Sequence, residues 1–367
     1  MNTFNDFNLL PSLRKTLKEK GFRTPTEIQG LTLPELLAGK SVVGLSETGS
    51  GKTLAYVLPV LQQLKTLENE GDAIREEGRP RAVVVVPTRE LGEQVAKVFK
   101  EFTHSTRLRV RSVLGGTKIK MAKQTVSGSF EVLVATPSRL HQLVEHGLKL
   151  NDVRIVVFDE ADQMLDHSFI QAATGLVKAC PPHPQMILFS ATISKVVDGL
   201  IRNLFSNVQV FRSSGSHRVT RTLTTKNLTV VNGERFPVLQ NWLEKKNEGG
   251  ILIFTNTKKQ CDTLAELLEA HGTPCAIFRG GMDRLERRKN LKRFTDNEVD
   301  ILISTDLGSR GLDFDDLKCV INYHLPQEMD NYLHRAGRTA RAGKTGLVVN
   351  FVTERDKPLM DQVKPSS

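Results

Sequence analysis

The sequence predicts an α/β fold of two domains, each a mostly parallel sheet with helices on both faces. The chain has 367 residues, which is more than one core of ordinary size and suits two. Short β-branched runs alternate with amphipathic segments in both halves, a pattern typical of parallel sheets covered by helices. Between the halves, residues 213–222 contain Ser-Ser-Gly-Ser and lose apolar periodicity. We therefore expect domains over residues 1–210 and 223–360, a linker over 211–222 and a short tail over 361–367.

The hydrophobic pattern predicts the individual elements. In the first half we expect strands at residues 41–45, 82–86, 109–114, 131–134, 155–158 and 186–189, with helices such as 90–102 and 138–145 between them. In the second half we expect strands at residues 226–231, 250–254, 275–278, 300–303, 319–321 and 346–350. The helices expected there span residues 236–246, 258–270 and 284–294.

The composition is that of a soluble globular protein, with 39% hydrophobic and 25% charged residues. No apolar run approaches the ~18 residues of a membrane span. Residues 1–10 lack the basic and apolar regions of a signal peptide, so we expect a cytoplasmic protein with no membrane partner. The cysteines form no CxxC pair and have no adjacent His cluster, so reduced, mostly buried thiols are expected in place of zinc or disulfides. They are Cys180, Cys261, Cys275 and Cys319.

The excess positive charge is shared between the halves. Residues 1–210 contain 26 Lys+Arg against 21 Asp+Glu, and residues 211–367 contain 25 against 20, so each part carries +5 of the total +10. A polyanion that lies across both halves would suit this distribution. Many mildly basic proteins bind no nucleic acid, so charge alone leaves that alternative open.

Residues 46–53 read Ser-Glu-Thr-Gly-Ser-Gly-Lys-Thr between an expected strand and an expected helix, which is the context of a phosphate-binding loop. Gly49 and Gly51 allow backbone N–H groups to turn toward phosphate oxygens, and the helix that begins near Lys52 directs its positive end at them. Lys52 can reach the β- and γ-phosphates, and Thr53 can ligate Mg²⁺. A flexible Gly-rich loop is the competing interpretation, and it does not account for the accompanying strand, Lys and Thr.

The expected strand at residues 155–158 runs into Asp159-Glu160-Ala161-Asp162. Open α/β sheets bind ligands beyond the carboxyl ends of their strands. Asp159 can therefore hold Mg²⁺ through water, and Glu160 can polarise an attacking water. An acidic N-cap of the next helix is the alternative.

Residues 334–341 read His-Arg-Ala-Gly-Arg-Thr-Ala-Arg, with arginines at three-residue spacing. Three guanidinium groups on one helical face suit a phosphate ligand. They belong to the second domain, whereas the phosphate loop belongs to the first. If they reach the γ-phosphate, ATP would close an interdomain cleft and act as a switch. A solvated basic patch is the alternative.

Taken together, these motifs resemble the DEAD-box RNA helicases of superfamily 2, over residues 4–352. The resemblance implies two tandem RecA-like domains and a minimal bacterial-type helicase core. Residues 21–29 resemble the family's Q motif, with Phe4 as its upstream aromatic, so Gln29 would select ATP by its adenine edge. The implied ATP-binding residues are Phe4, Phe22, Thr26, Gln29, Ser46, Glu47, Thr48, Gly49, Ser50, Gly51, Lys52, Thr53, Asp313, Arg338 and Arg341.

The resemblance also implies roles in catalysis. Ser190-Ala191-Thr192 resembles the motif that links hydrolysis to strand separation, and Asp313 is expected near the ribose. Arg338 and Arg341 match arginine fingers, and His334 with Arg335 match coupling positions. The implied catalytic set is Lys52, Asp159, Glu160, Ser190, Thr192, His334, Arg338 and Arg341, with Thr53 and Asp159 at Mg²⁺.

The RNA face follows from the same resemblance. The implied contacts are Pro87, Thr88, Arg89, Gly115, Gly116, Thr136, Pro137 and Arg139 in the first domain, and Thr257, Arg284, Arg287, Thr305, Asp306 and Gly308 in the second. Arginines suit phosphates, and the glycine pair lets backbone N–H groups approach a strand. Few aromatics occur in these motifs, which predicts weak sequence specificity and strong salt dependence.

Some positions depart from the family pattern. Ser46-Glu47 replaces Ala-Gln, which adds a negative charge beside the phosphate site. Residues 279–282 read Arg-Gly-Gly-Met in place of His-Gly-Asp-Met, and Arg284 replaces a Gln that contacts RNA. Gly308-Ser309 replaces two alanines. None of these changes removes a catalytic group, so they affect rates and affinities and leave the class of activity unchanged.

The resemblance predicts an ATP-dependent RNA helicase, with RNA-stimulated hydrolysis and Mg²⁺ as cofactor. Three alternatives differ in activity: an ATP-gated RNA clamp or ribonucleoprotein remodeller with little unwinding, a non-enzymatic RNA-binding scaffold, and a DNA translocase. We expect a monomer that binds single-stranded RNA and short duplexes. Partners from ribosome assembly or RNA decay are compatible with this prediction.

Overall fold

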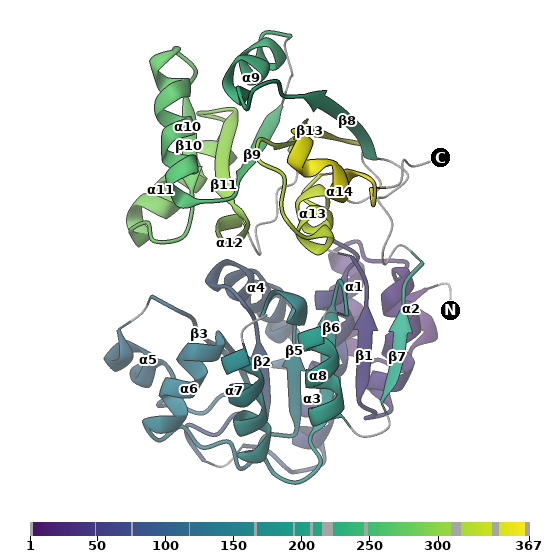
Figure 1. The fold of residues 1–367 in the computed structure, drawn as a ribbon. Helices are drawn as coiled ribbons and strands as arrows, with labels where there is room; N and C mark the ends of the chain where they lie inside the picture. Colours follow the sequence, from purple (N-terminus) through teal and green to yellow (C-terminus); the bar gives the residue numbers. More distant parts are fainter. Residues whose placement is uncertain are drawn as a thin grey trace. The chain divides into compact units, whose positions relative to one another are not determined.

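The computed structural model divides into two compact units, Met1–Ser216 and His217–Ser367. It describes residues 3–47, 49–74, 76–116, 118–164, 167–193, 195–205, 208–214, 223–245, 249–309, 317–339 and 345–363. Each unit contains a parallel sheet flanked by helices, which confirms the predicted fold class. Figure 1 labels the helices and strands that are named below.

The first unit is built on a seven-stranded sheet in the order β3-β4-β2-β5-β6-β1-β7, in which every described pairing is parallel. Its strands are β1 (Val42–Leu45), β2 (Ala82–Val85), β3 (Val110–Val113), β4 (Val132–Ala135), β5 (Ile155–Phe158), β6 (Gln185–Ser190) and β7 (Gln209–Arg212). Its helices are η1 (Phe4–Asp6), α1 (Pro11–Glu19), α2 (Glu27–Leu37), α3 (Lys52–Asn69), α4 (Arg89–Thr106), α5 (Ile119–Thr125), α6 (Pro137–Glu145), η2 (Ala161–Gln163), α7 (His167–Lys178) and α8 (Lys195–Leu204).

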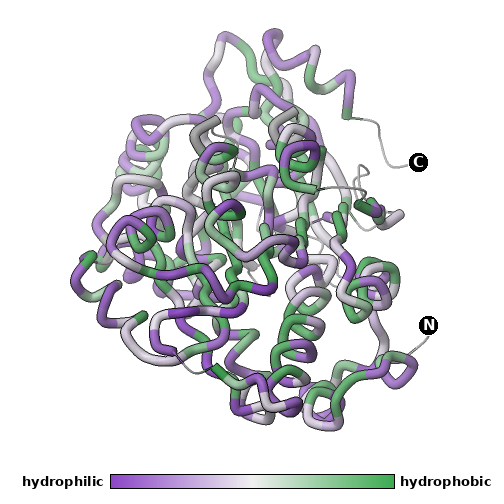
Figure 2. The backbone as a smooth tube through the Cα atoms, turned by 90° about the horizontal axis from the view of Figure 1, so that it is seen from below, coloured by the Kyte–Doolittle hydropathy of each residue, from purple (hydrophilic) through white to green (hydrophobic). Residues whose placement is uncertain are grey.

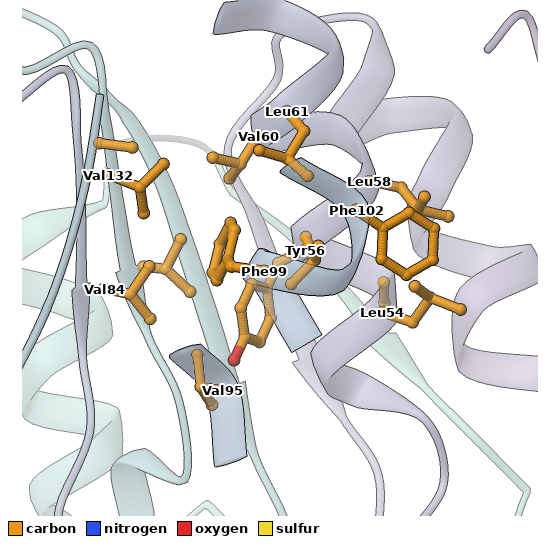
Figure 3. Packing of buried hydrophobic residues seen from close by; sticks show 14 of the residues in the cluster. Leu54, Tyr56, Leu58, Val60, Leu61, Val84, Val95, Phe99, Phe102 and Val132 are labelled. Atoms are coloured by element: carbon orange, nitrogen blue, oxygen red, sulfur yellow. The ribbon is translucent and has the colours of Figure 1, made fainter. Parts of the chain in front are cut away.

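Hydrophobic clusters cover both faces of this sheet because successive strand residues point to opposite sides. Val84 packs with α1 to α4 in one cluster, whereas its neighbours Val83 and Val85 pack with α5 to α8 in the other. Figure 3 shows side chains of α3 and α4 gathered against Val84 and Val132 of the sheet. Each fully buried apolar side chain in these clusters contributes about 1.5–3 kcal/mol. Burial on both faces explains why the strands read as continuous apolar runs.

The second unit has a six-stranded parallel sheet in the order β10-β11-β9-β12-β13-β8. Its strands are β8 (Leu223–Thr229), β9 (Gly250–Thr255), β10 (Cys275–Phe278), β11 (Ile301–Thr305), β12 (Leu317–Asn322) and β13 (Gly346–Val352). Its helices are α9 (Arg235–Leu243), α10 (Lys258–Ala270), α11 (Arg284–Thr295), α12 (Asp306–Ser309), α13 (Met329–Ala336), η3 (Glu354–Asp356) and α14 (Lys357–Met360). Two hydrophobic clusters again lie on opposite faces.

The boundary expected at residue 210 needs correction. Strand β7 continues to Arg212 and pairs with β1, and the amide of Ser213 donates to the carbonyl of Leu45 at 3.0 Å. Residues 211–213 therefore belong to the first sheet and not to a linker. Residues 215–222 of the expected linker and 364–367 of the expected tail lie outside the described residues. Strand β8 also begins three residues earlier than expected, at Leu223.

The hydropathy of the backbone follows the same organisation. Along the tube in Figure 2, helical turns alternate between hydrophilic and hydrophobic residues, as expected of helices that lie on a sheet with one face in solvent. Within the part of the chain that the structure describes, no helix combines the length and the apolar character that crossing a membrane requires.

Candidate nucleotide-binding and nucleic-acid-binding sites

The candidate phosphate loop connects β1 to α3. Gly49 and Gly51 have φ values of 84° and 88°, a left-handed conformation that glycine adopts without the steric cost of a Cβ. The amide of Ser46 donates to the carbonyl of Ser190 at 3.0 Å, which fixes the start of the loop on β6. The Nζ of Lys52 donates to the carbonyl of Ser46 at 2.7 Å, which keeps its positive charge at the loop. The loop thus lies between a strand and a helix, as the sequence predicted, and its role in binding phosphate stays a prediction.

The predicted adenine-selecting residue is bonded to the phosphate loop. Gln29 is 4% exposed, and its Nε2 donates to the carbonyl of Gly51 at 2.9 Å. Its Oε1 accepts from the amide of Thr26 at 2.9 Å, which closes a capping box at the start of α2. A single buried amide thus connects the end of the Q motif to the helix that begins at Lys52.

The carboxylates of the acidic motif lie at the end of β5. The amide of Asp159 donates to the carbonyl of Val85, and Glu160 has a left-handed φ of 51°, so the chain turns sharply there. Burial and the neighbouring Glu160 raise the pKa of Asp159 to about 6, while Lys52 acts in the opposite direction. The side-chain amide of Gln163 donates to the Glu160 carboxylate. Both acids are therefore held at fixed orientations at the carboxyl edge of the sheet.

Tyr56 is a site residue that the sequence analysis missed. Its side chain is fully buried, and its hydroxyl donates to Oδ2 of Asp159 at 2.8 Å. Burial, followed by the charge of Asp159, raises the pKa of Tyr56 well above its usual value of 10.0. The position reads as one more apolar residue of a helix, but its spacing of four residues from Lys52 was a signal, because residues four apart share a helix face.

The Ser190-Ala191-Thr192 segment contacts Asp162, the last carboxylate of the acidic motif. The hydroxyl of Ser190 donates to the carbonyl of Thr192 at 2.7 Å, and the hydroxyl of Thr192 lies 3.5 Å from Oδ2 of Asp162. The segment that follows β6 is thereby connected to the acidic motif that follows β5.

Strand order divides the carboxyl edge of the first sheet into two parts. The neighbouring strands β5, β6 and β1 lead into the acidic motif, the Ser-Ala-Thr segment and the phosphate loop. The neighbouring strands β3, β4 and β2 lead into the three predicted RNA-contacting motifs. Because carboxyl ends of parallel strands meet at one edge, the two sets lie side by side, with the β2–β5 pairing at their boundary.

The predicted RNA-contacting residues of the first unit form one group. The Nη1 of Arg89 donates to the carbonyl of Gly115 at 2.8 Å, and Arg89 also pairs with Glu93. Gly116 has a φ of 83°, which favours glycine there. The neighbouring motif residues lie at helix starts, with Thr88 and Thr136 as N-caps of α4 and α6, Pro137 in the first turn of α6, and Pro87 and Arg139 beside them.

The second unit brings its predicted RNA residues together in the same way. The Nη2 of Arg287 donates to the carbonyl of Gly308 at 3.1 Å, and the amide of Gly308 donates to the hydroxyl of Thr305. A Cβ on Gly308 would lie 2.4 Å from the carbonyl oxygen of Phe278, so only glycine fits. Thr257 caps α10 at the end of β9, the strand next to β11.

Arg335 is buried in the second unit, 1% exposed, and hydrogen-bonds to several residues around it. Its Nε and Nη2 donate to the two carboxylate oxygens of Asp306 at 2.5 and 2.7 Å. It also donates to the side chains of Asn256 and Asn322. Asn322 in turn bonds to Asn350, which lies opposite it in β13. The carboxylate of Asp306, predicted to contact RNA, is therefore engaged by Arg335 within the unit.

Several predicted site residues, or their side chains, lie outside the part of the chain that the structure describes. Thr48, Asp313 and Arg341 lie outside the described residues, and the side chain of Arg284 does as well. His334 lies in the last turn of α13, and the Nε of Arg338 donates to the carbonyl of His334 at 3.3 Å. In the first unit, Phe4 is buried in a hydrophobic cluster, whereas Phe22 is 46% exposed.

Comparisons with known proteins identify the family to which these motifs belong. The DEAD/DEAH box helicase family model matches residues 26–200, and the helicase conserved C-terminal domain model matches residues 234–343. RhpA, a DEAD-box ATP-dependent RNA helicase of Helicobacter pylori, is 34% identical over 96% of this chain and 70% of its own length. RhlB of Actinobacillus succinogenes, an ATP-dependent RNA helicase, is 34% identical over 96% of this chain and 85% of its own length. The chain spans 46% of a third relative, the probable ATP-dependent RNA helicase ddx27 of Dictyostelium discoideum, at 34% identity.

Solved structures resemble the whole chain. Dbp5 of S. cerevisiae bound to RNA and ADP BeF3 has a TM-score of 0.86 at 25% identity, covering 100% of this chain and 93% of that one. Mss116p bound to ssRNA and AMP-PNP has a TM-score of 0.83 at 25% identity, covering 98% of this chain and 75% of that one. Both structures contain RNA together with a nucleotide analogue.

Proposed function

Because this chain belongs to the DEAD-box family and is an ATP-dependent RNA helicase, we propose that Lys52, Asp159 and Glu160 of its first unit carry out the ATP hydrolysis. The observation that carries the proposal is the convergence of Lys52, Asp159 and Glu160 at the carboxyl ends of β1 and β5, beside the strand ends that lead into the RNA motifs. This arrangement supports phosphoryl transfer that responds to RNA. The Dbp5 and Mss116p complexes, which contain RNA and a nucleotide analogue, support the same conclusion.

In the first unit, Lys52 binds the β- and γ-phosphates, and the backbone N–H groups at Gly49 and Gly51 surround them. Glu160 polarises the water that attacks the γ-phosphate, and the amide of Gln163 orients its carboxylate. Gln29 has its amide at the loop, where the adenine edge is read.

Thr53 and Asp159 would hold Mg²⁺, Thr53 directly and Asp159 through water. A hydroxyl and a carboxylate fit this ion, since it prefers oxygen ligands and is usually bound through one or two carboxylates, waters and substrate phosphates. Among the residues that the structure describes, no group of three His, Cys, Asp or Glu side chains could hold a metal by itself. When bound, the ion neutralises charge on the phosphate oxygens.

In the second unit, Arg338 and Arg341 match the arginine fingers of the family, and we assign them to the γ-phosphate on that ground. Both follow α13 in the sequence, and Arg335 of α13 is fixed by Asp306 and Asn256. The RNA-contacting residues assigned to each unit support the separation of short duplexes. A monomeric, cytoplasmic enzyme with little sequence preference completes the proposal.

Replacing Glu160 with Gln tests the proposal, since the amide cannot polarise water but has the same shape. The variant should bind ATP and RNA with unchanged affinity and lose RNA-stimulated ATP turnover and unwinding of a short duplex. Glu145→Gln, which removes an exposed acid at the end of α6, is the matched control and should retain turnover. Normal hydrolysis by the Glu160 variant would disprove the assignment. Normal hydrolysis without unwinding in the unmodified chain would identify an RNA clamp.

A further inference from the structure

The hydroxyl of Tyr56 bonds to one of the two residues assigned to Mg²⁺. It donates to Oδ2 of Asp159 at 2.8 Å. Tyr56 lies on α3, the helix that begins at Lys52 of the phosphate loop, whereas Asp159 follows β5. A single buried hydroxyl therefore connects the helix of the phosphate loop to the acidic motif.

The surroundings of Tyr56 are otherwise apolar. Its ring lies against Phe99, with centroids 6.3 Å apart, and against Phe189 at 5.9 Å. Figure 3 shows Tyr56 and Phe99 packed together among the leucines and valines of this cluster. A phenylalanine would fill the same space without burying a hydroxyl, and a buried hydroxyl without a partner is costly. The polar atom is thus explained by its bond to Asp159 and not by packing.

The Asp159 carboxylate is held from two directions. Tyr56 bonds to Oδ2, and the backbone amide of Glu160 donates to Oδ1 at 2.9 Å. The second bond depends on the left-handed turn at Glu160, with a φ of 51°. Each oxygen has a second lone pair, so both can still accept a hydrogen bond from metal-bound water.

We propose that Tyr56 is a positioning residue that sets Asp159 in the orientation required to hold the Mg²⁺ of a bound nucleotide. The inference rests on the proposed magnesium site and adds the group that orients its carboxylate. Groups that hydrogen-bond to metal ligands fix the ligand geometry, and their loss typically lowers metal affinity 10–100-fold. Tyr56 touches neither ATP nor RNA, so its removal should affect the metal and leave metal-free nucleotide binding intact.

The experiment uses the full chain with Tyr56→Phe, which removes only the hydroxyl. A fluorescent ADP analogue is titrated with EDTA present and again at increasing Mg²⁺. The Mg²⁺ concentration that gives half the increase in affinity should rise about 10-fold in the variant. Affinity in EDTA should stay within about twofold of the unmodified chain, because Lys52 and the loop are unchanged. Tyr332→Phe, which also removes a fully buried hydroxyl that is bonded to Asn350, should not shift the Mg²⁺ dependence.

A double-variant cycle separates orientation of Asp159 from general damage. In an Asp159→Asn background, Tyr56→Phe should cause no further shift in Mg²⁺ dependence, since the carboxylate it orients is gone. An unchanged Mg²⁺ dependence in Tyr56→Phe would overturn the inference, as would an equal loss of affinity with and without Mg²⁺. If the unmodified chain itself bound ADP equally with and without Mg²⁺, the proposed magnesium site would fail instead. Thermal melting of each variant verifies that the chains compared are folded.

Discussion

Arg335 donates two parallel hydrogen bonds to Asp306, and this pair joins helix α13 to the start of α12, which follows β11. Arg335 is almost completely buried, while the carboxylate of Asp306 is 27% exposed. Removing the carboxylate leaves a charge in the interior with only neutral partners, and breaking a buried pair in this way costs about 3 kcal/mol. We therefore expect Asp306→Ala to destabilise the second unit by about that amount.

The single tryptophan, Trp242 on α9, reports on this unit, so urea unfolding followed by its fluorescence measures the effect. Asp262→Ala is the matched control, because it breaks the Arg279–Asp262 pair, in which the side chains are 22% and 38% exposed. A partly exposed pair contributes less than about 1 kcal/mol. Equal losses in the two variants would show that the Arg335 pair is no more important than a surface contact.

Gly51 is expected to resist substitution because of Gln29. Alanine at this position would adopt a φ of 88° and place its Cβ 2.5 Å from Nε2 of Gln29. Gly71→Ala is a control with a similar φ of 91° and no atom within 4 Å. Both changes should cost about 1–2 kcal/mol from the left-handed backbone. Only Gly51→Ala should also lower affinity for a fluorescent ADP analogue, by about 10-fold or more, since a displaced loop costs at least about 1.4 kcal/mol of binding.

Comparing the two alanine variants separates the effect of the left-handed backbone, which both share, from the effect of the contact with Gln29, which only Gly51→Ala has. If both alanine variants bound the ADP analogue as the unmodified chain does, the bond between Gln29 and Gly51 would have no part in shaping the site. The melting temperatures of both variants should fall because of the backbone strain that they share, and that of Gly51→Ala should fall at least as far, since its Cβ also meets Gln29.

The cysteines are expected to react slowly in the folded protein. Burial raises the pKa of Cys180, Cys261 and Cys319 to about 12, and that of Cys275 to about 11. A raised pKa means that the reactive thiolate is scarce at pH 8 and increases only as the pH approaches these values. A disulfide reagent such as DTNB should therefore modify the native thiols about 100-fold more slowly than those of the chain in concentrated guanidinium chloride. Rapid reaction of one native thiol would show that its surroundings open readily.

Much of the fold could be predicted because each buried strand has its own signal. Strand β5 is a run of four apolar residues, and the structure gives it the same bounds as the sequence did. Strand β7 was missed because it lies at the sheet edge, with most of Gln209–Arg212 exposed, and carries no apolar pattern. Its position depends on pairing with β1, which is about 165 residues earlier in the chain, and such long-range pairing leaves no local trace.

The site residues could be predicted where the backbone conformation requires a particular residue type. They could not be predicted where the contact joins side chains that are far apart in the sequence. Gly49, Gly51 and Lys52 are required by the loop itself. Tyr56 looked like core because only the fold brings its hydroxyl to Asp159, 103 residues away. In the same way, the sequence marked Arg335 for coupling but could not show that Asn256, Asn322 and Asp306 surround it.

Arg89 is expected to contribute a phosphate contact to RNA binding. Its guanidinium is anchored by Glu93 and the carbonyl of Gly115, at the edge where the RNA motifs of the first unit meet. Each phosphate contact with a single strand releases counterions and adds about 0.7 to the slope of log affinity against log salt. Arg89→Ala should therefore weaken binding of a single-stranded RNA and reduce that slope by about 0.7. Fluorescence anisotropy at several salt concentrations measures both quantities.

Arg111→Ala is the control: it removes the same charge from an exposed position on β3 and should change the slope little. A loss of affinity in Arg89→Ala with an unchanged slope would mean that Arg89 only holds the Gly115 turn in place, and equal slopes in both variants would reject the phosphate contact.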